Sequence, residues 1–137
     1  MADLKKLISE IGTDPNPLWI LRELEELILD NGSMRTFLTS DNLLHKVDLG
    51  KLRLKPVRIF FLRSSTLEQI IPVLKVRCLV AGIKAEIQMG GFAQYQQEAF
   101  SFDSALYAFN PDIIILAIAL DDLAPAFTRD FSGLSEE

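Results

Sequence analysis

The spacing of apolar and polar positions divides the chain into a helical first part and a second part where strands alternate with helices. Over the first fifty residues, apolar side chains recur every three or four positions, as in helices with one buried face. The helices expected there span Asp3–Ile11, Leu18–Leu29 and Met34–His45. We therefore predict an N-terminal helical segment over residues 1–50.

Three later stretches have the composition of strands. They are Val57–Leu62, with branched and aromatic side chains, Ile83–Met89, which alternates apolar with polar residues, and Asp112–Leu120, which is almost wholly apolar. Helical patterns separate them. Strands joined by helices indicate parallel pairing with right-handed crossovers. The predicted fold class is α/β, with a partial, three-layer open parallel sheet of βαβαβ order over residues 51–137.

The first of these connecting helices carries both start and stop signals. Ser65 with Glu68 three residues later has the spacing of a capping box, and Gly82 stands where a left-handed residue ends many helices. Pro72 inside this helix predicts a kink.

The third strand poses a problem of pairing. The alternating second strand suits a sheet edge, so the expected spatial order is second, first, third, and a fully apolar strand should have neighbours on both sides. The residues after Leu120 show no strand pattern. Three completions stay open: a longer natural protein, which we favour, another copy pairing with residues 113–120, or the N-terminal helices folding over that edge.

Composition narrows the function classes. The chain has 137 residues, 49% of them hydrophobic and 24% charged, with a net charge of −5. The acidic balance argues against nucleic-acid binding, and the longest apolar run is too short to span a membrane. Cys78 is the only cysteine, which excludes an internal disulfide and a cysteine-based zinc site. A pattern typical of a secretory leader is not visible, so we expect a cytoplasmic setting.

Ligands of open parallel sheets gather at the carboxyl ends of the strands. We expect this crevice to be lined by residues that follow the three strands: Arg63, Ser64, Ser65, Thr66, Gly90, Gly91, Phe92, Gln94, Tyr95, Asp121 and Asp122. A helix beginning at the first loop would offer backbone N–H groups to an anion, and the Arg63 guanidinium would add a fork of donors.

Each candidate also has a purely structural interpretation. Ser65 and Thr66 can serve as helix caps, and the glycine pair can form a tight turn. The aspartates can be solvated charges, and the aromatic residues can belong to the core or its rim.

Serine catalysis needs a base, usually a histidine. The only histidine, His45, precedes the first strand in a helical stretch, where a surface or interface position is expected. The sequence also lacks a GxSxG elbow, a GxGxxG fingerprint, a Walker A loop and a DxDxT motif. From these residues we assign no catalytic residue, and we expect neither a metal site nor a cofactor in this chain.

From Pro56 to Leu120 the sequence resembles the N-terminal domain of FkbH-like proteins. The matching stretches read PVRIFFLRSSTLEQIIPVLK, AGIKAEIQMGGFAQYQQEAF and DSALYAFNPDIIILAI. The resemblance implies an SGNH-hydrolase-like fold, related to flavodoxin-like sheets, that is followed by a haloacid-dehalogenase-type (HAD-type) domain. Such bacterial proteins load a glyceryl unit derived from 1,3-bisphosphoglycerate onto the phosphopantetheine thiol of an acyl carrier protein in polyketide biosynthesis. They also remove its phosphate, and the magnesium belongs to the second domain.

By the same resemblance, the nucleophilic serine of SGNH hydrolases corresponds to Ser64 or Ser65, and the oxyanion-hole glycine to Gly90 or Gly91. The asparagine expected after the third strand is replaced by Asp121 and Asp122. The leading hypothesis is therefore a non-catalytic module that positions the carrier arm or acyl substrate and contacts an acyl carrier protein or the adjoining domain. The alternatives are an SGNH-type esterase or acyltransferase, and an interaction protein whose copies pair edge to edge.

Overall fold

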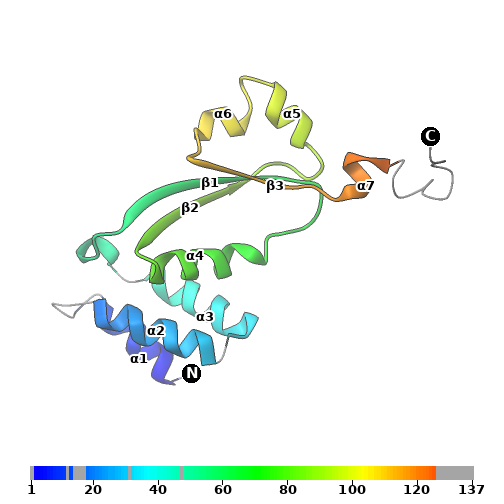
Figure 1. The fold of residues 1–137 in the computed structure, drawn as a ribbon. Helices are drawn as coiled ribbons and strands as arrows, with labels where there is room; N and C mark the ends of the chain where they lie inside the picture. The colour runs from blue at the N-terminus through cyan, green and yellow to red at the C-terminus, as the bar shows by residue number, and fades with distance from the viewer. Residues whose placement is uncertain (1, 12, 14–17, 31, 47, 126–137) are drawn as a thin grey trace, which may run out of the picture. The chain divides into compact units, whose positions relative to one another are not determined.

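The computed structural model describes residues 2–11, 13, 18–30, 32–46 and 48–125 (Figure 1). The chain is an α/β protein with N-terminal helices and a three-stranded parallel sheet of order β2-β1-β3, which confirms the predicted fold class and strand order. It divides into two compact units. Unit 1 comprises Met1–Val57 and Glu68–Glu86, and unit 2 comprises Arg58–Leu67 and Ile87–Glu137. The predicted domains, residues 1–50 and 51–137, stay a prediction.

Unit 1 is built from helices around one apolar core. Its helices are α1 (Ala2–Ile11), α2 (Leu18–Asp30), α3 (Met34–Leu44) and α4 (Ile70–Val80), with a 3₁₀ turn, η1, over Leu49–Lys51. The three helices predicted before residue 50 are thus confirmed to within a residue or two at each end. Each α-helix contributes the apolar side of its periodic pattern to the core, whose buried members are Leu4, Ile8, Leu21, Leu24, Ile28, Phe37, Leu44, Leu52, Val76 and Leu79.

Helix α4 begins later than predicted. The capping box is wrong, because the N-cap residue is Gln69 and Ser65 lies five positions before the first helical residue. Pro72 is consequently the third residue of α4, where a backbone N–H has no partner within the helix, so the ring removes no helical hydrogen bond. At the other end the prediction is confirmed: Gly82 has a φ of +77°, and its N–H donates to the Leu79 carbonyl at 2.9 Å.

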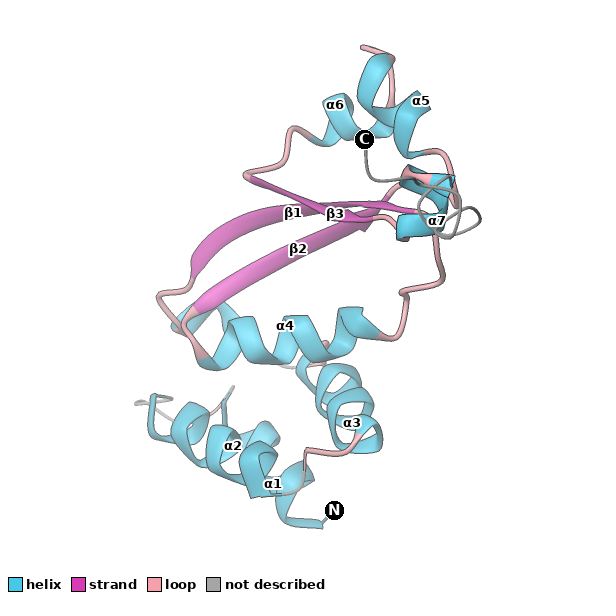
Figure 2. Cartoon of the chain, turned by 45° about the vertical axis from the view of Figure 1, so that its right-hand side comes forward, coloured by secondary structure: helices cyan, strands magenta, loops and turns pink. Residues whose placement is uncertain are grey.

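Unit 2 holds the paired residues of the central strand and of the strand at one edge. Strand β1 spans Lys55–Arg63, β2 spans Ile83–Met89 and β3 spans Ile113–Ala117. Strands β1 and β3 are parallel, with Phe60 opposite Ile114 and Leu62 opposite Leu116. Helices α5 (Tyr95–Phe100) and α6 (Ala105–Phe109) lie on one face of these strands (Figures 1 and 2).

A small second core lies between this face and the two helices. Phe60, Leu62 and Leu106 are its buried residues, and Tyr95 and Phe109 pack against them. The alternation of a strand sends Phe60 and Leu62 to the same side, which explains why both meet α6. The opposite face of β1 carries Ile59 and Phe61, which are also buried.

Strand β3 is shorter than predicted. It ends at Ala117, and Leu120–Leu123 forms a short helix, α7, so the expected strand over 112–120 is wrong at its end. The N–H groups of Asp122 and Leu123 donate to the Ala119 carbonyl at 3.1 Å, and carboxylates in a first helical turn are favourable. Apolar residues alone do not distinguish a strand from a helix, which is why the pattern ran on to Leu120.

In the described part of the chain, β3 is paired with β1 and stands last in the strand order. Its side chains remain accessible: Ile113 is 47% exposed, Ile114 49% and Leu116 68%. The expectation of an apolar strand at the border of the sheet is therefore met over 113–117.

Candidate functional site

The carboxyl end of β1 is anchored to the segment that follows β3. Ser64 directly follows β1, is buried at 7% exposure, and donates its backbone N–H to the Ala117 carbonyl at 3.2 Å. Its side-chain Oγ accepts the backbone N–H of Ala119 at 2.8 Å. This hydroxyl thus satisfies a main-chain donor at the point where the chain leaves the sheet, which is a structural task.

Arg63 joins the first loop to the glycine loop. Its Nε donates to the Gly90 carbonyl at 3.0 Å, and one terminal nitrogen lies 3.5 Å from the Ser65 carbonyl. The Arg63 guanidinium, which was predicted to bind an anion, therefore uses at least some of its N–H groups for hydrogen bonds to backbone oxygens. Arg63 holds the ends of β1 and β2 together and fixes the position of the glycine pair.

The glycine loop lies close against the sheet. The N–H of Gly90 donates to the Phe61 carbonyl at 2.9 Å. A Cβ at Gly90 would lie 3.2 Å from Phe60 Cε1 and 3.3 Å from Glu98 Cγ, a spacing tighter than side chains normally tolerate. Close packing beneath α5 therefore favours glycine at this position.

The residues after Gly90 form the turn into α5. A Cβ at Gly91 would collide with the side-chain amide of Gln94. The backbone N–H of Gln94 donates to the Gly91 carbonyl at 3.2 Å. Ala93 adopts a left-handed φ of 55°. Phe92 is 60% exposed at the tip, so this loop presents an aromatic side chain to solvent.

Tyr95 connects α5 with α7. Its ring packs against the second core, and its hydroxyl donates to the Asp122 carbonyl at 3.2 Å. Asp121 and Asp122 themselves are exposed in the first turn of α7. Over the described residues no three His, Cys, Asp or Glu side chains gather in a way that could hold a metal ion.

The structure thus brings together some predicted site residues and leaves others apart. Arg63 and Ser64 meet Gly90 and the segment after β3, and Tyr95 meets Asp122. Ser65 and Thr66 are exposed in a bend before α4 and do not begin a helix. The predicted helical N–H cradle is therefore absent from the loop over residues 64–67.

A general base for Ser64 is not supplied within unit 2 by any described histidine. His45, the only histidine, is the C-cap residue of α3 in unit 1, where its Nε2 lies 3.6 Å from Asp41 Oδ1. The geometry around Ser64 provides hydrogen bonding and close packing, without the imidazole that serine catalysis ordinarily uses.

Glu98 is an organising residue that sequence reasoning missed. Its Oε2 accepts the N–H of Leu106 at 3.1 Å, and its carbonyl accepts the Ser104 hydroxyl at 2.7 Å. Ser104 is the N-cap residue of α6, but the acceptor that caps the helix is the carboxylate of Glu98. The sequence around the start of α6 does not indicate this capping interaction, because Glu98 lies in the preceding helix.

The fold and this strand-end cluster define the class of protein: an open-sheet α/β domain whose candidate site lies at the carboxyl ends of β1 and β2. No family model, curated protein or solved structure matches the chain. None of the helices within the described residues is long and apolar enough to cross a membrane.

Proposed function

We propose that this chain is a non-catalytic SGNH-like module of an FkbH-like biosynthetic protein. Its task is to position an acyl carrier protein, with its phosphopantetheine arm or acyl unit, for an adjoining HAD-type domain that loads a glyceryl-type unit. The sequence resemblance over residues 56–120 supports this, and so does a serine after β1 beside a glycine loop after β2. The proposed setting is the cytoplasm.

The environment of Ser64 carries the non-catalytic part of the proposal. A serine nucleophile needs an accessible Oγ and a neighbouring base. Ser64 is 7% exposed, and its Oγ accepts the backbone N–H of Ala119. Such a hydroxyl stabilises the loop after β3, and an esterase or acyltransferase reaction at Ser64 or Ser65 is the less favoured alternative.

Exposed apolar side chains near the strand ends support the positioning part. Phe92 stands at the tip of the glycine loop, and Leu120 and Leu123, exposed at 58% and 66%, lie on α7. The Tyr95–Asp122 hydrogen bond links α5, which directly follows the glycine loop, to α7. Apolar side chains surrounded by polar residues are typical of docking surfaces. The surface formed by Phe92, Leu120 and Leu123 is therefore the proposed binding place for the carrier arm.

Calorimetry with an acyl carrier protein tests the proposal. We expect heat of binding with the phosphopantetheinylated carrier and a weaker signal with the carrier that lacks the arm. Leu123→Ser should weaken binding about tenfold, since it removes one exposed apolar anchor. Phe102→Ser is the matched control, because Phe102 is 86% exposed but lies between α5 and α6. Absence of heat with both carrier forms would count against the proposal.

The exposed side chains of β3 favour a second candidate, pairing through the sheet edge. An accessible apolar edge strand is a template for another strand, either from the adjoining domain or from a second copy. Light scattering over a range of concentrations separates these two partners, because only self-association raises the apparent mass of the isolated chain as its concentration rises.

A further inference from the structure

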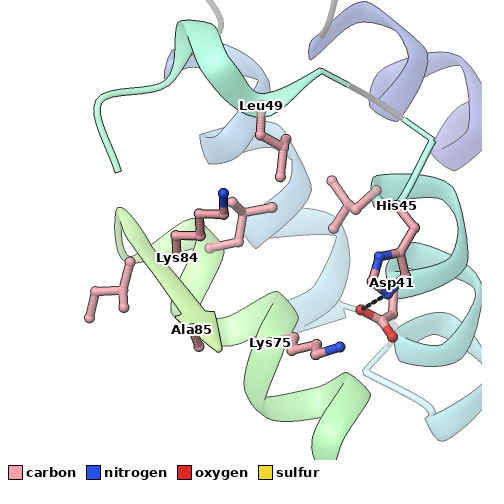
Figure 3. A pocket seen from close by; sticks show the side chains of 9 residues that line it. Asp41, His45, Leu49, Lys75, Lys84 and Ala85 are labelled. Carbon is pink, nitrogen blue, oxygen red and sulfur yellow. Dashed lines mark ion pairs between the residues drawn. The ribbon is translucent and has the colours of Figure 1, made fainter. Parts of the chain in front are cut away.

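Unit 1 contains a hollow that the proposed function does not use. It has a volume of about 170 Å³ and lies between α3, η1, α4 and the first residues of β2 (Figure 3). All its lining residues belong to unit 1. Sequence reasoning missed this hollow because its polar residues come from three separate elements.

Positive charge predominates in the hollow. Lys75 on α4 and Lys84 on β2 both line it, and neither ammonium group has an ion-pair partner in the part of the chain that the structure describes. Figure 3 shows Lys75 extending toward the Asp41–His45 pair, with Lys84 across the hollow beside Leu49. Two lysine side chains and one carboxylate thus line the hollow.

The carboxylate of Asp41 lies beside the imidazole of His45. Asp41 Oδ1 lies 3.6 Å from His45 Nε2, and the Asp41 side chain is 20% exposed against 62% for His45. The pair stands at the C-terminal end of α3, at a spacing that brings side chains together. Because the described residues give neither lysine an ion-pair partner, an anion entering the hollow meets two ammonium groups and one carboxylate.

The floor of the hollow is apolar. Leu44 and Leu79 are buried members of the unit 1 core, and Ile83 lines the same wall from β2. A wider hollow of about 600 Å³ adjoins it, sharing Leu44, His45, Leu49 and Lys84 and reaching Pro56. A ligand can thus place a charged head at the lysines and an apolar tail along this groove.

We infer that the hollow is a binding site for a small organic anion, with a carboxylate or phosphate-ester head and a short unbranched apolar tail. Lys75 and Lys84 hold the head by charge-assisted hydrogen bonds, and Leu44, Leu79 and Ile83 receive the tail. The volume of this hollow is smaller than that of a typical drug-sized pocket, so the part of the ligand that binds inside it is small. This site lies in unit 1 and does not depend on the proposed function.

Nuclear magnetic resonance titration of the full chain tests the inference with five probes: butyl phosphate, butyrate, ethyl phosphate, inorganic phosphate and butanol. We expect saturable amide shifts at His45, Leu49, Lys84 and Ala85 with the first two probes. Each buried methylene should strengthen binding about fourfold, so butyl phosphate should bind more tightly than ethyl phosphate and far more tightly than inorganic phosphate. Comparing butyl phosphate with butyrate identifies the preferred head group.

Charge variants complete the test. Lys84→Gln and Lys75→Gln should each weaken butyl phosphate binding about tenfold, whereas Lys6→Gln, which changes an exposed lysine on α1, should leave it unchanged. Asp41→Asn should strengthen it, because a like charge is removed. The spectrum of each variant reports that it is folded. Equal binding of butanol, unchanged affinity in Lys84→Gln, or no saturable shifts through millimolar probe would overturn the inference.

Discussion

Unit 1 and unit 2 differ in how completely they bury their large apolar side chains. In unit 1 each helix sends its apolar side into a shared core, and residues such as Leu24 and Ile28 are at most 1% exposed. In unit 2 the buried core is small, and a long series of large apolar side chains stays accessible: Phe92, Phe100, Phe102, Tyr107, Ile113, Ile114, Leu116, Leu120 and Leu123. Large exposed apolar surfaces are typical of interaction sites, and this difference supports the docking proposed for unit 2, although unit 1 also exposes Leu29 and Leu38.

The largest loss of stability is expected when a buried side chain in the small core of unit 2 is truncated. Phe60 is fully buried and its ring lies 6.0 Å from that of Phe109. Phe60→Ala should lower the free energy of unfolding by about 3–5 kcal/mol, measured by urea denaturation. Leu24→Ala is the counterpart in unit 1, with an expected loss of about 2–5 kcal/mol. A loss below about 1 kcal/mol for Phe60→Ala would show that unit 2 has no tight core of its own.

A smaller loss of unfolding free energy is expected from a substitution at the end of β1. Ser64→Ala leaves the Ala119 N–H without its protein acceptor. Because Ala119 is exposed and water can replace that acceptor, the expected loss is about 0.5–1.5 kcal/mol of unfolding free energy. Ser65→Ala is the matched control, since Ser65 is exposed and its hydroxyl makes no hydrogen bond in the described structure, and it should change stability by less than about 0.5 kcal/mol. Equal losses in the two variants would remove the structural role assigned to Ser64.

A charge on the sheet edge should change association more than stability. Leu116→Lys alters a side chain that is 68% exposed on β3, so the free energy of unfolding should move by only about 0.5 kcal/mol. Any self-association seen by light scattering should fall, because lysine on an edge strand discourages pairing. Leu38→Lys, at 47% exposure on α3, is the comparison in unit 1 and should leave association unchanged.

The smallest effect concerns a surface carboxylate of unit 2. The hydrogen bond from the Ser101 hydroxyl at 2.6 Å, with a backbone hydrogen bond, holds the pKa of Asp103 below its usual value. The stabilisation is therefore present above the pKa of the unfolded chain and is lost as the pH falls through the lowered folded pKa. Ser101→Ala should raise the Asp103 pKa in a carbon-13 titration, and an unchanged pKa would assign the shift to the backbone instead.

The sequence predicted the elements better than their ends. Regular alternation located Ile83–Met89 correctly, because a half-buried strand leaves its period in the sequence. The capping-box spacing of Ser65 and Glu68 was misleading, since the chain makes a bend there and α4 starts only at Ile70. A motif of four residues carries no information about the length of loop that is needed before the helix can pack.

The candidate site was predictable as a place but not as a set of contacts. Parallel pairing put Ser64 and Gly90 at the same edge of the sheet, and the structure joins their loops through Arg63. The acceptor role of Ser64 depends on the backbone N–H of Ala119, fifty-five positions later. Main-chain partners at such separations leave no residue-type signal, and the same holds for Lys75 and Lys84 in the unit 1 hollow.

Labelling with a serine-reactive fluorophosphonate, read by mass spectrometry of the intact chain and its peptides, tests the central claim most directly. If Ser64 serves the loop after β3 and unit 2 acts by docking, the folded chain should stay unlabelled at both Ser64 and Ser65. Stoichiometric labelling that disappears in Ser64→Ala or in Ser65→Ala, while both variants remain folded, would contradict the claim and establish a nucleophile at the end of β1.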